Sequence, residues 1–126
     1  MNLNQHNILL KSIWEVINKT RLSGQKEYAA DQENVFANFD RIAKQLKLDK
    51  KVVLWVYLMK HVDGVASYIK GHHSQREDVR GRMTDIIVYL SLLWGMIEEE
   101  SAEEKPDEEF KPEYKGEWTS EPDRFK

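Results

Sequence analysis

Proline is absent from the first 100 residues of this 126-residue chain, and Pro106, Pro112 and Pro122 all lie in the remainder. Over the same 100 residues apolar side chains recur every three to four positions, which is the period of an amphipathic helix. The clearest series runs from Val79 to Ile97. We find no strand-like alternation of useful length. The sequence therefore predicts an all-α protein.

Four helices are expected in this part of the chain. The first two cover 4–22 and 31–46, the third follows Asp49 as its N-cap and ends at Gly71, and the fourth runs on to about Glu100. Ser74 and Glu77 have the spacing of a capping box for the fourth helix. Short connections make neighbouring helices antiparallel, so we expect a four-helix bundle-like core with a hairpin around Gly71.

Residues 101–126 have a different character. They carry a net charge of −4, whereas residues 1–100 carry +1. Their aromatic residues follow no helical or strand period: Phe110, Tyr114, Trp118 and Phe125. We therefore expect a helical domain over 1–100 and an irregular acidic tail over 101–126, which docks on its own domain or on a protein partner.

Composition excludes several classes of protein. Cysteine is absent, so disulfides, thiolate metal sites and thiol nucleophiles are excluded. The formal net charge of −3 gives no strong signal for nucleic-acid binding. No apolar run approaches the roughly 20 residues of a membrane span, and the first residues lack the features of a secretory signal. We expect a cytoplasmic protein, in the host cytoplasm if the gene is phage-encoded.

Polar residues accompany the apolar stripes of the third and fourth helices. Pairing these faces across the hairpin brings Lys60, Asp63, Asp78, Arg82 and Asp85 near one another. Lys60 and Arg82 could hold a phosphate, and the carboxylates could hold a divalent cation, with Mg²⁺ the expected one. The candidate metal ligands are Asp63, Glu77, Asp78 and Asp85. The alternative is a solvated ion-pair network.

Two other groups of residues carry side chains that can bind a metal ion or a nucleotide. His61, His72 and His73 lack spacings such as H-E-x-x-H, and we do not expect them to bind metal. Asn34 and Asn38 are four residues apart, on one face of the second expected helix, with Tyr28 nearby. These three could contact a base edge or a ribose. The alternative is that Asn34 caps the helix and Asn38 is exposed.

An ordered set of short motifs resembles a known family. The set comprises Lys26-Glu27-Tyr28, Asn34-x-Phe36-x-Asn38-Phe39, Tyr57-Leu58-Met59-Lys60-His61-x-Asp63, Glu77, and Gly81-Arg82-x-x-Asp85-x-x-x-Tyr89-Leu90. Over residues 20–98 the chain is similar to the phage and prophage family called nucleotide modification associated domain 1. That resemblance implies an all-helical protein that acts on or around modified nucleotides in phage DNA metabolism.

The same resemblance extends distantly to the all-α nucleotide pyrophosphohydrolases of the MazG type. Those enzymes bind Mg²⁺ through carboxylates in an E-x-x-E and an E-x-x-D pattern. Here Asp63 has no acidic partner three residues away, and the fourth helix has no E-x-x-D. Lys60 and His61 stand where an acid pair would be expected.

Three functions remain open. The first is a nucleotide-binding protein with the ligand between the second, third and fourth helices, Lys60 and Arg82 on phosphate, and Tyr28, Asn34 and Asn38 on sugar or base. The second is a Mg²⁺-dependent nucleotide pyrophosphohydrolase. The third is a protein-interaction module or inhibitor of a host factor that acts through the tail.

We also predict a homodimer, because the three tryptophans Trp14, Trp55 and Trp94 cannot all be buried easily in one small core.

Overall fold

The computed structural model describes residues 1–29, 33–102, 110–112, 114 and 116. Its described residues form four α-helices and one π-helical turn: α1 (Leu3–Gly24), η1 (Gln25–Ala29), α2 (Ala37–Leu46), α3 (Lys50–Ile69) and α4 (Val79–Ala102). The all-α prediction is confirmed. None of the helices in the described ranges is both long enough and apolar enough to span a membrane.

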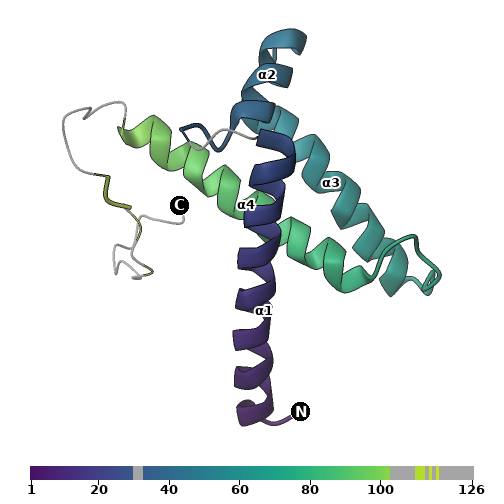
Figure 1. Ribbon diagram of the computed structural model, residues 1–126. Coiled ribbons are helices and arrows are strands. Elements are labelled where there is room, and N and C mark those ends of the chain that lie inside the picture. Colours follow the sequence, from purple (N-terminus) through teal and green to yellow (C-terminus); the bar gives the residue numbers. More distant parts are fainter. Residues whose placement is uncertain (30–32, 103–109, 113, 115, 117–126) are drawn as a thin grey trace, which may run out of the picture.

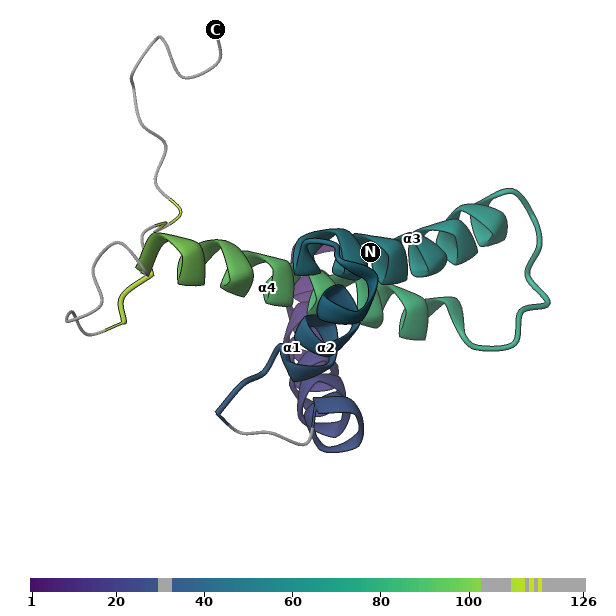
Figure 2. The same cartoon turned by 90° about the horizontal axis from the view of Figure 1, so that it is seen from above.

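Helices α3 and α4 lie side by side as a hairpin, and α1 crosses α4 near its middle (Figure 1). Helix α2 packs against α3, and η1 contacts both α1 and α2. Seen from above, α1 and α2 lie across the hairpin rather than along it (Figure 2). The packing is thus bundle-like, with the α3–α4 hairpin as the platform for α1 and α2.

The core lies where α2, α3 and α4 meet. Its two fully buried side chains are Leu54 and Met96. The buried cluster around them consists of Phe36, Phe39, Ala43 and Val53. Lys50 closes this end of the core: its ammonium lies 3.4 Å from Asp40, 3.1 Å from Glu99 and 5.1 Å from the centre of the Phe36 ring. These contacts tie α2, α3 and α4 together at one end.

Two predicted helix starts need correction. The second helix begins at Ala37 rather than at position 31, because the Asn34 side chain accepts the Phe36 N–H and holds the chain in a turn. The capping box of Ser74 and Glu77 is also wrong. Helix α4 starts at Val79, and the Asp78 side chain accepts the Arg80 N–H at 2.8 Å.

The first helix was predicted to end at Leu22, but α1 runs to Gly24 and continues into η1, so that predicted end is wrong. Both predicted ends of α3 are confirmed. The Asp49 side chain caps α3 by accepting the Lys51 N–H at 2.8 Å. Helix α3 ends at Ile69, and Gly71 follows with φ of +107°, which only glycine adopts readily. The expected hairpin therefore turns at Gly71.

The first half of α1 has no covering layer within the described chain. Every residue from Met1 to Ser12 is exposed, and this half of the helix extends beyond the body of the molecule (Figure 1). The indole side chains of Trp14, Trp55 and Trp94 are also exposed, with 56%, 50% and 48% of their surface accessible. The chain thus leaves a large apolar area on its outside.

The expected tail is described only in part. Helix α4 continues to Ala102, two residues beyond the expected boundary at 100. Further on, the ring of Tyr114 lies 5.4 Å from the ring of Trp94. Residues 103–109, 113, 115 and 117–126, with Trp118 and Phe125, lie outside the described residues.

Candidate functional site

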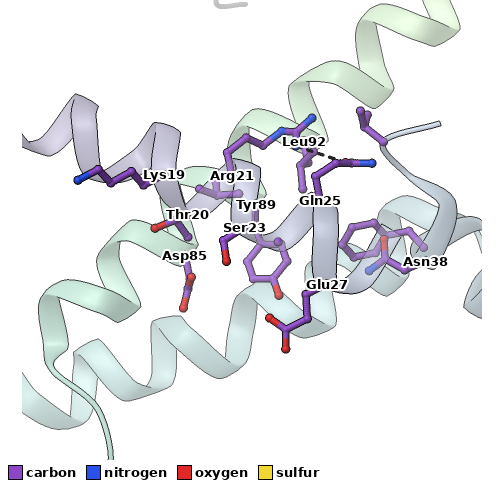
Figure 3. A pocket seen from close by; sticks show the side chains of 14 residues that line it. Lys19, Thr20, Arg21, Ser23, Gln25, Glu27, Asn38, Asp85, Tyr89 and Leu92 are labelled. Atoms are coloured by element: carbon purple, nitrogen blue, oxygen red, sulfur yellow. Dashed lines mark hydrogen bonds between the residues drawn. The ribbon is translucent and has the colours of Figure 1, made fainter. Parts of the chain in front are cut away.

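A pocket of about 420 Å³ lies between α1, η1, α2 and α4. Its apolar wall is formed by Val35, Phe39, Val88, Tyr89 and Leu92. Its polar residues are Lys19, Thr20, Arg21, Ser23, Gln25, Glu27, Asn38 and Asp85. Figure 3 shows the Tyr89 ring in the middle of this arrangement, with Asp85 on one side and Asn38 on the other. An apolar wall with a few polar groups is the usual character of a small-molecule site.

The end of α1 supplies one side of the pocket through an unusual backbone turn. After Gly24 the chain continues as the π-helical turn η1, and the Gln25 N–H bonds to the carbonyls of Arg21 and Leu22. The Arg21 guanidinium in turn donates to Gln25 Oε1 at 3.3 Å (Figure 3). Single π-turns are rare and occur frequently at functional sites. Here the turn places Gln25 and Glu27 among the lining residues.

Asp85 belongs both to this pocket and to a second polar group. Its Oδ2 lies 3.6 Å from His61 Nδ1, and Glu77 Oε1 lies 4.0 Å from the same nitrogen. Burial raises the pKa of the Asp85 carboxyl above its ordinary value. His61 opposes that rise, and the nearby Glu77 adds to it, while Arg82 and Lys60 lower it. The ionised form of Asp85 is therefore less favourable than in water, and a cation bound nearby would stabilise it.

Arg82 orients Glu77 and fills the space between α3 and α4. Its Nη1 lies 3.4 Å from Glu77 Oε1, and its Nε donates to Gln75 Oε1 at 3.0 Å. Gln75 Nε2 then donates to the Gly64 carbonyl on α3 at 2.8 Å. A Cβ at Gly64 would lie 2.5 Å from the Arg82 side chain, so a larger residue here would require Arg82 to shift. The predicted phosphate ligand Arg82 is thus engaged with protein groups.

The structure brings some of the other predicted hairpin residues together and separates others. Lys60 lies close enough for its charge to lower the pKa of Asp85. In the described part of the chain, the group able to share one metal ion is His61, Glu77 and Asp85, so Asp63 and Asp78 lie outside it. Asp78 instead contacts Arg80 Nη1 at 3.0 Å.

The three residues expected to contact a sugar or base are not on one helix face. Asn34 precedes α2, and its Nδ2 donates to Asp40 Oδ2 at 2.9 Å. Asn38 is on α2 and lines the pocket. Tyr28 belongs to η1, but its side chain lies outside the described part of the structure. Asn38 is therefore the member of this set that the structure places beside the pocket.

Comparison with known proteins gives no match. No family model, no curated protein and no solved structure is significantly similar to this chain. The assignment of function therefore depends on the residues of the site itself.

Sequence reasoning missed two parts of this site. It did not include α1, whose Lys19 and Arg21 line the pocket, because it placed the ligand between the second, third and fourth helices. It also set His61 aside as a ligand. Leu54, Leu58 and His61 are spaced as one helical face, and all three are buried. A histidine in line with buried leucines is the signal that could have identified it.

Proposed function

We propose that the protein binds a nucleotide in the pocket between α1, η1, α2 and α4 and acts in phage-type nucleotide or DNA-modification metabolism. The observation that supports this most is that Asp85 belongs to two neighbouring features, the pocket and a polar group on the hairpin. It lines a pocket of about 420 Å³ and lies 3.6 Å from His61 in a polar group with Glu77. A ligand that fits both places has an apolar planar part and a charged part.

The base and sugar occupy the apolar end of the pocket in this proposal. Phe39 and Tyr89 have rings 6.2 Å apart in an edge-on arrangement, and both line the pocket. Such faces suit a planar heterocycle, and the Asn38 amide offers both a donor and an acceptor to its edge. The volume is within the roughly 300–1,000 Å³ of typical small-molecule sites.

The phosphates extend past Asp85 toward the hairpin. Lys19 is on the pocket lining, and the charges of Lys60 and Arg82 also act on Asp85. Cationic side chains attract phosphate oxygens, and a divalent cation on the carboxylates would bridge to the same phosphates. The short motifs that resemble those of the nucleotide modification family favour the same class of ligand.

Thermal unfolding against a panel of nucleotides tests this proposal. The panel contains mono-, di- and triphosphates, cyclic nucleotides and modified deoxynucleotides, each with and without a divalent cation. Ligand at 100 times its dissociation constant adds about 2.7 kcal/mol of stability, which gives a clear rise in melting temperature. A nucleoside and inorganic triphosphate serve as controls for the two halves of the ligand. A flat panel would contradict nucleotide binding.

A Mg²⁺-dependent nucleotide pyrophosphohydrolase is the second candidate. It is favoured by Asp85, which lines the pocket, and by Glu77, which has a donor atom close enough to share an ion with Asp85. Hydrolysis at two metal ions needs several converging carboxylates, and Asp63 on α3 is outside that group. Release of pyrophosphate from a nucleoside triphosphate would favour the enzyme over a binding protein.

A protein-interaction role remains the third proposal. Its support is the acidic, aromatic tail and the contact of Tyr114 with Trp94 on α4. If the tail binds a protein partner, removal of residues 103–126 should abolish that binding while the helices stay folded. Partner binding that is unchanged after this truncation would contradict a role for the tail.

We also propose that two copies of the chain associate through the first half of α1. Residues 3–13 include Leu3, Ile8, Leu9, Leu10 and Ile13 and carry one formal charge, on Lys11. This half of α1 is exposed along its whole length up to Ser12, and its nearly uncharged apolar face suits an identical face. We expect light scattering to give about twice the monomer mass at micromolar concentrations, and Leu10→Glu to lower it. A monomer mass across that concentration range would contradict the dimer.

A further inference from the structure

His61 is a buried polar side chain whose Nδ1 has no hydrogen-bond partner. The residue is 8% exposed, and the Nδ1 atom is inaccessible to solvent. The two carboxylate oxygens beside it, Asp85 Oδ2 at 3.6 Å and Glu77 Oε1 at 4.0 Å, are too distant for a hydrogen bond. A buried and unpaired nitrogen is unfavourable, so a native protein normally gives such an atom a partner.

The distances from His61 Nδ1 to the two carboxylates suit a shared metal ion better than a direct hydrogen bond. Two ligands that are each about 2.1 Å from one ion can be no more than about 4.2 Å apart. The separations of 3.6 Å and 4.0 Å from Nδ1 are both within this limit. One donor atom from each of the three residues lies within 4.8 Å of the others, so the set comes close to the spacing that one ion requires.

Charged and aromatic side chains surround these donors. Arg82 contacts Glu77 at 3.4 Å from the side of α4, and Lys60 acts on Asp85 from α3. On the other side, the Tyr89 ring lies 5.6 Å from the His61 ring. Groups that orient the ligands in this way are the usual second layer of a metal site.

We propose that His61, Glu77 and Asp85 form a site for one first-row transition-metal cation, of the Mn²⁺ or Zn²⁺ class, in preference to Mg²⁺. An imidazole nitrogen suits Zn²⁺ and its neighbours in the series, whereas Mg²⁺ prefers an all-oxygen set. The inference deepens the proposed function, because it names the cation at the phosphate end of the pocket. It is tested without nucleotide, so either proposal can fail while the other stands.

Isothermal titration of the full, untagged chain with ZnCl₂, MnCl₂ and MgCl₂ tests the site. We expect saturable binding of one Zn²⁺ or Mn²⁺ per chain, at least tenfold tighter than Mg²⁺. Zn²⁺ binding should also shift the ring resonances of His61 in a histidine-selective NMR spectrum. No saturable binding by the wild-type chain, or Mg²⁺ binding as tight as Mn²⁺ binding, would overturn the proposal.

Variants assign the binding to these residues. His61→Gln should weaken Zn²⁺ binding at least tenfold, and the more exposed Glu77→Gln should do the same if the first variant fails to fold. Asp78→Asn and the double change His72→Gln with His73→Gln are matched controls, because these residues lie outside the group. Loss of binding in either control, with binding retained in His61→Gln and Glu77→Gln, would overturn the assignment.

Discussion

Replacement of Asp85 by asparagine is expected to remove most of the stabilisation that a nucleotide gives to this protein. Asp85 is the residue shared by the pocket and by the group with His61 and Glu77. Asparagine keeps the shape but removes the charge that attracts a cation to the phosphate end. If the affinity falls a hundredfold, ligand that stabilised the wild type by about 2.7 kcal/mol will add only about 0.4 kcal/mol.

The same substitution should leave the free protein at least as stable at neutral pH. Burial raises the pKa of Asp85 in the folded state above its ordinary value of 3.8. Within the window between these two pKa values the folded state binds more protons than the unfolded state, so stability falls as the pH rises. Above that window the penalty is fully present in the wild type, and Asp85→Asn removes it. The difference between the two proteins should therefore shrink on acidification.

Thermal unfolding with and without nucleotide, from acid to neutral pH, measures both effects. Asp78→Asn is the control, since Asp78 pairs with Arg80 on the surface. Nucleotide stabilisation that is unchanged in Asp85→Asn would contradict the central role of Asp85 in binding. If binding persists but pyrophosphate release is lost, the hydrolase proposal is favoured instead.

The second large effect is expected from Gly64→Ala. In an ordinary exposed helix this change stabilises by up to about 1 kcal/mol. Here the new Cβ would lie 2.5 Å from Arg82 Cδ and Nε and 2.6 Å from Cζ. The Arg82 side chain is 14% exposed and bonded to Gln75, so it cannot move away without losing that contact and its pairing with Glu77. We expect a net loss of about 1–3 kcal/mol in urea unfolding.

Two further variants separate this clash from a general effect of alanine. Gly81→Ala, where no atom lies within 4 Å of the new Cβ, should stabilise the protein slightly. In an Arg82→Ala background, Gly64→Ala should become neutral or favourable, because the clashing side chain is gone. An equal loss in both backgrounds would show that the contact with Arg82 is not the cause.

The periodicity of the sequence was sufficient to predict the helices but not all of their ends. The third and fourth helices were found because Gly71 separates two long apolar stripes. The start of α2 was misplaced because the Asn34 side chain competes for the backbone N–H of Phe36, a contact that helix period does not reveal. The π-helical turn after Gly24 carries no distinct sequence pattern, so it too was missed.

The candidate site was only partly predictable for a related reason. Glu77, Arg82 and Asp85, which the structure brings together, also lie close together in the sequence. Lys19 and Arg21 come from a helix that crosses α4, and the sequence contains no signal of which helices cross. Their place at the pocket depends on tertiary packing alone.

The most direct test of the central claim is a map of the backbone amides that a nucleotide perturbs. The measurement is a series of ¹H–¹⁵N correlation spectra of the full chain, with the nucleotide that gives the largest melting shift added to saturation. We expect the largest shifts over residues 19–27 of α1 and η1, at Asn38 and Phe39, and from Asp85 to Leu92. Saturable shifts confined to other surfaces, or no shifts at all, would contradict binding in this pocket.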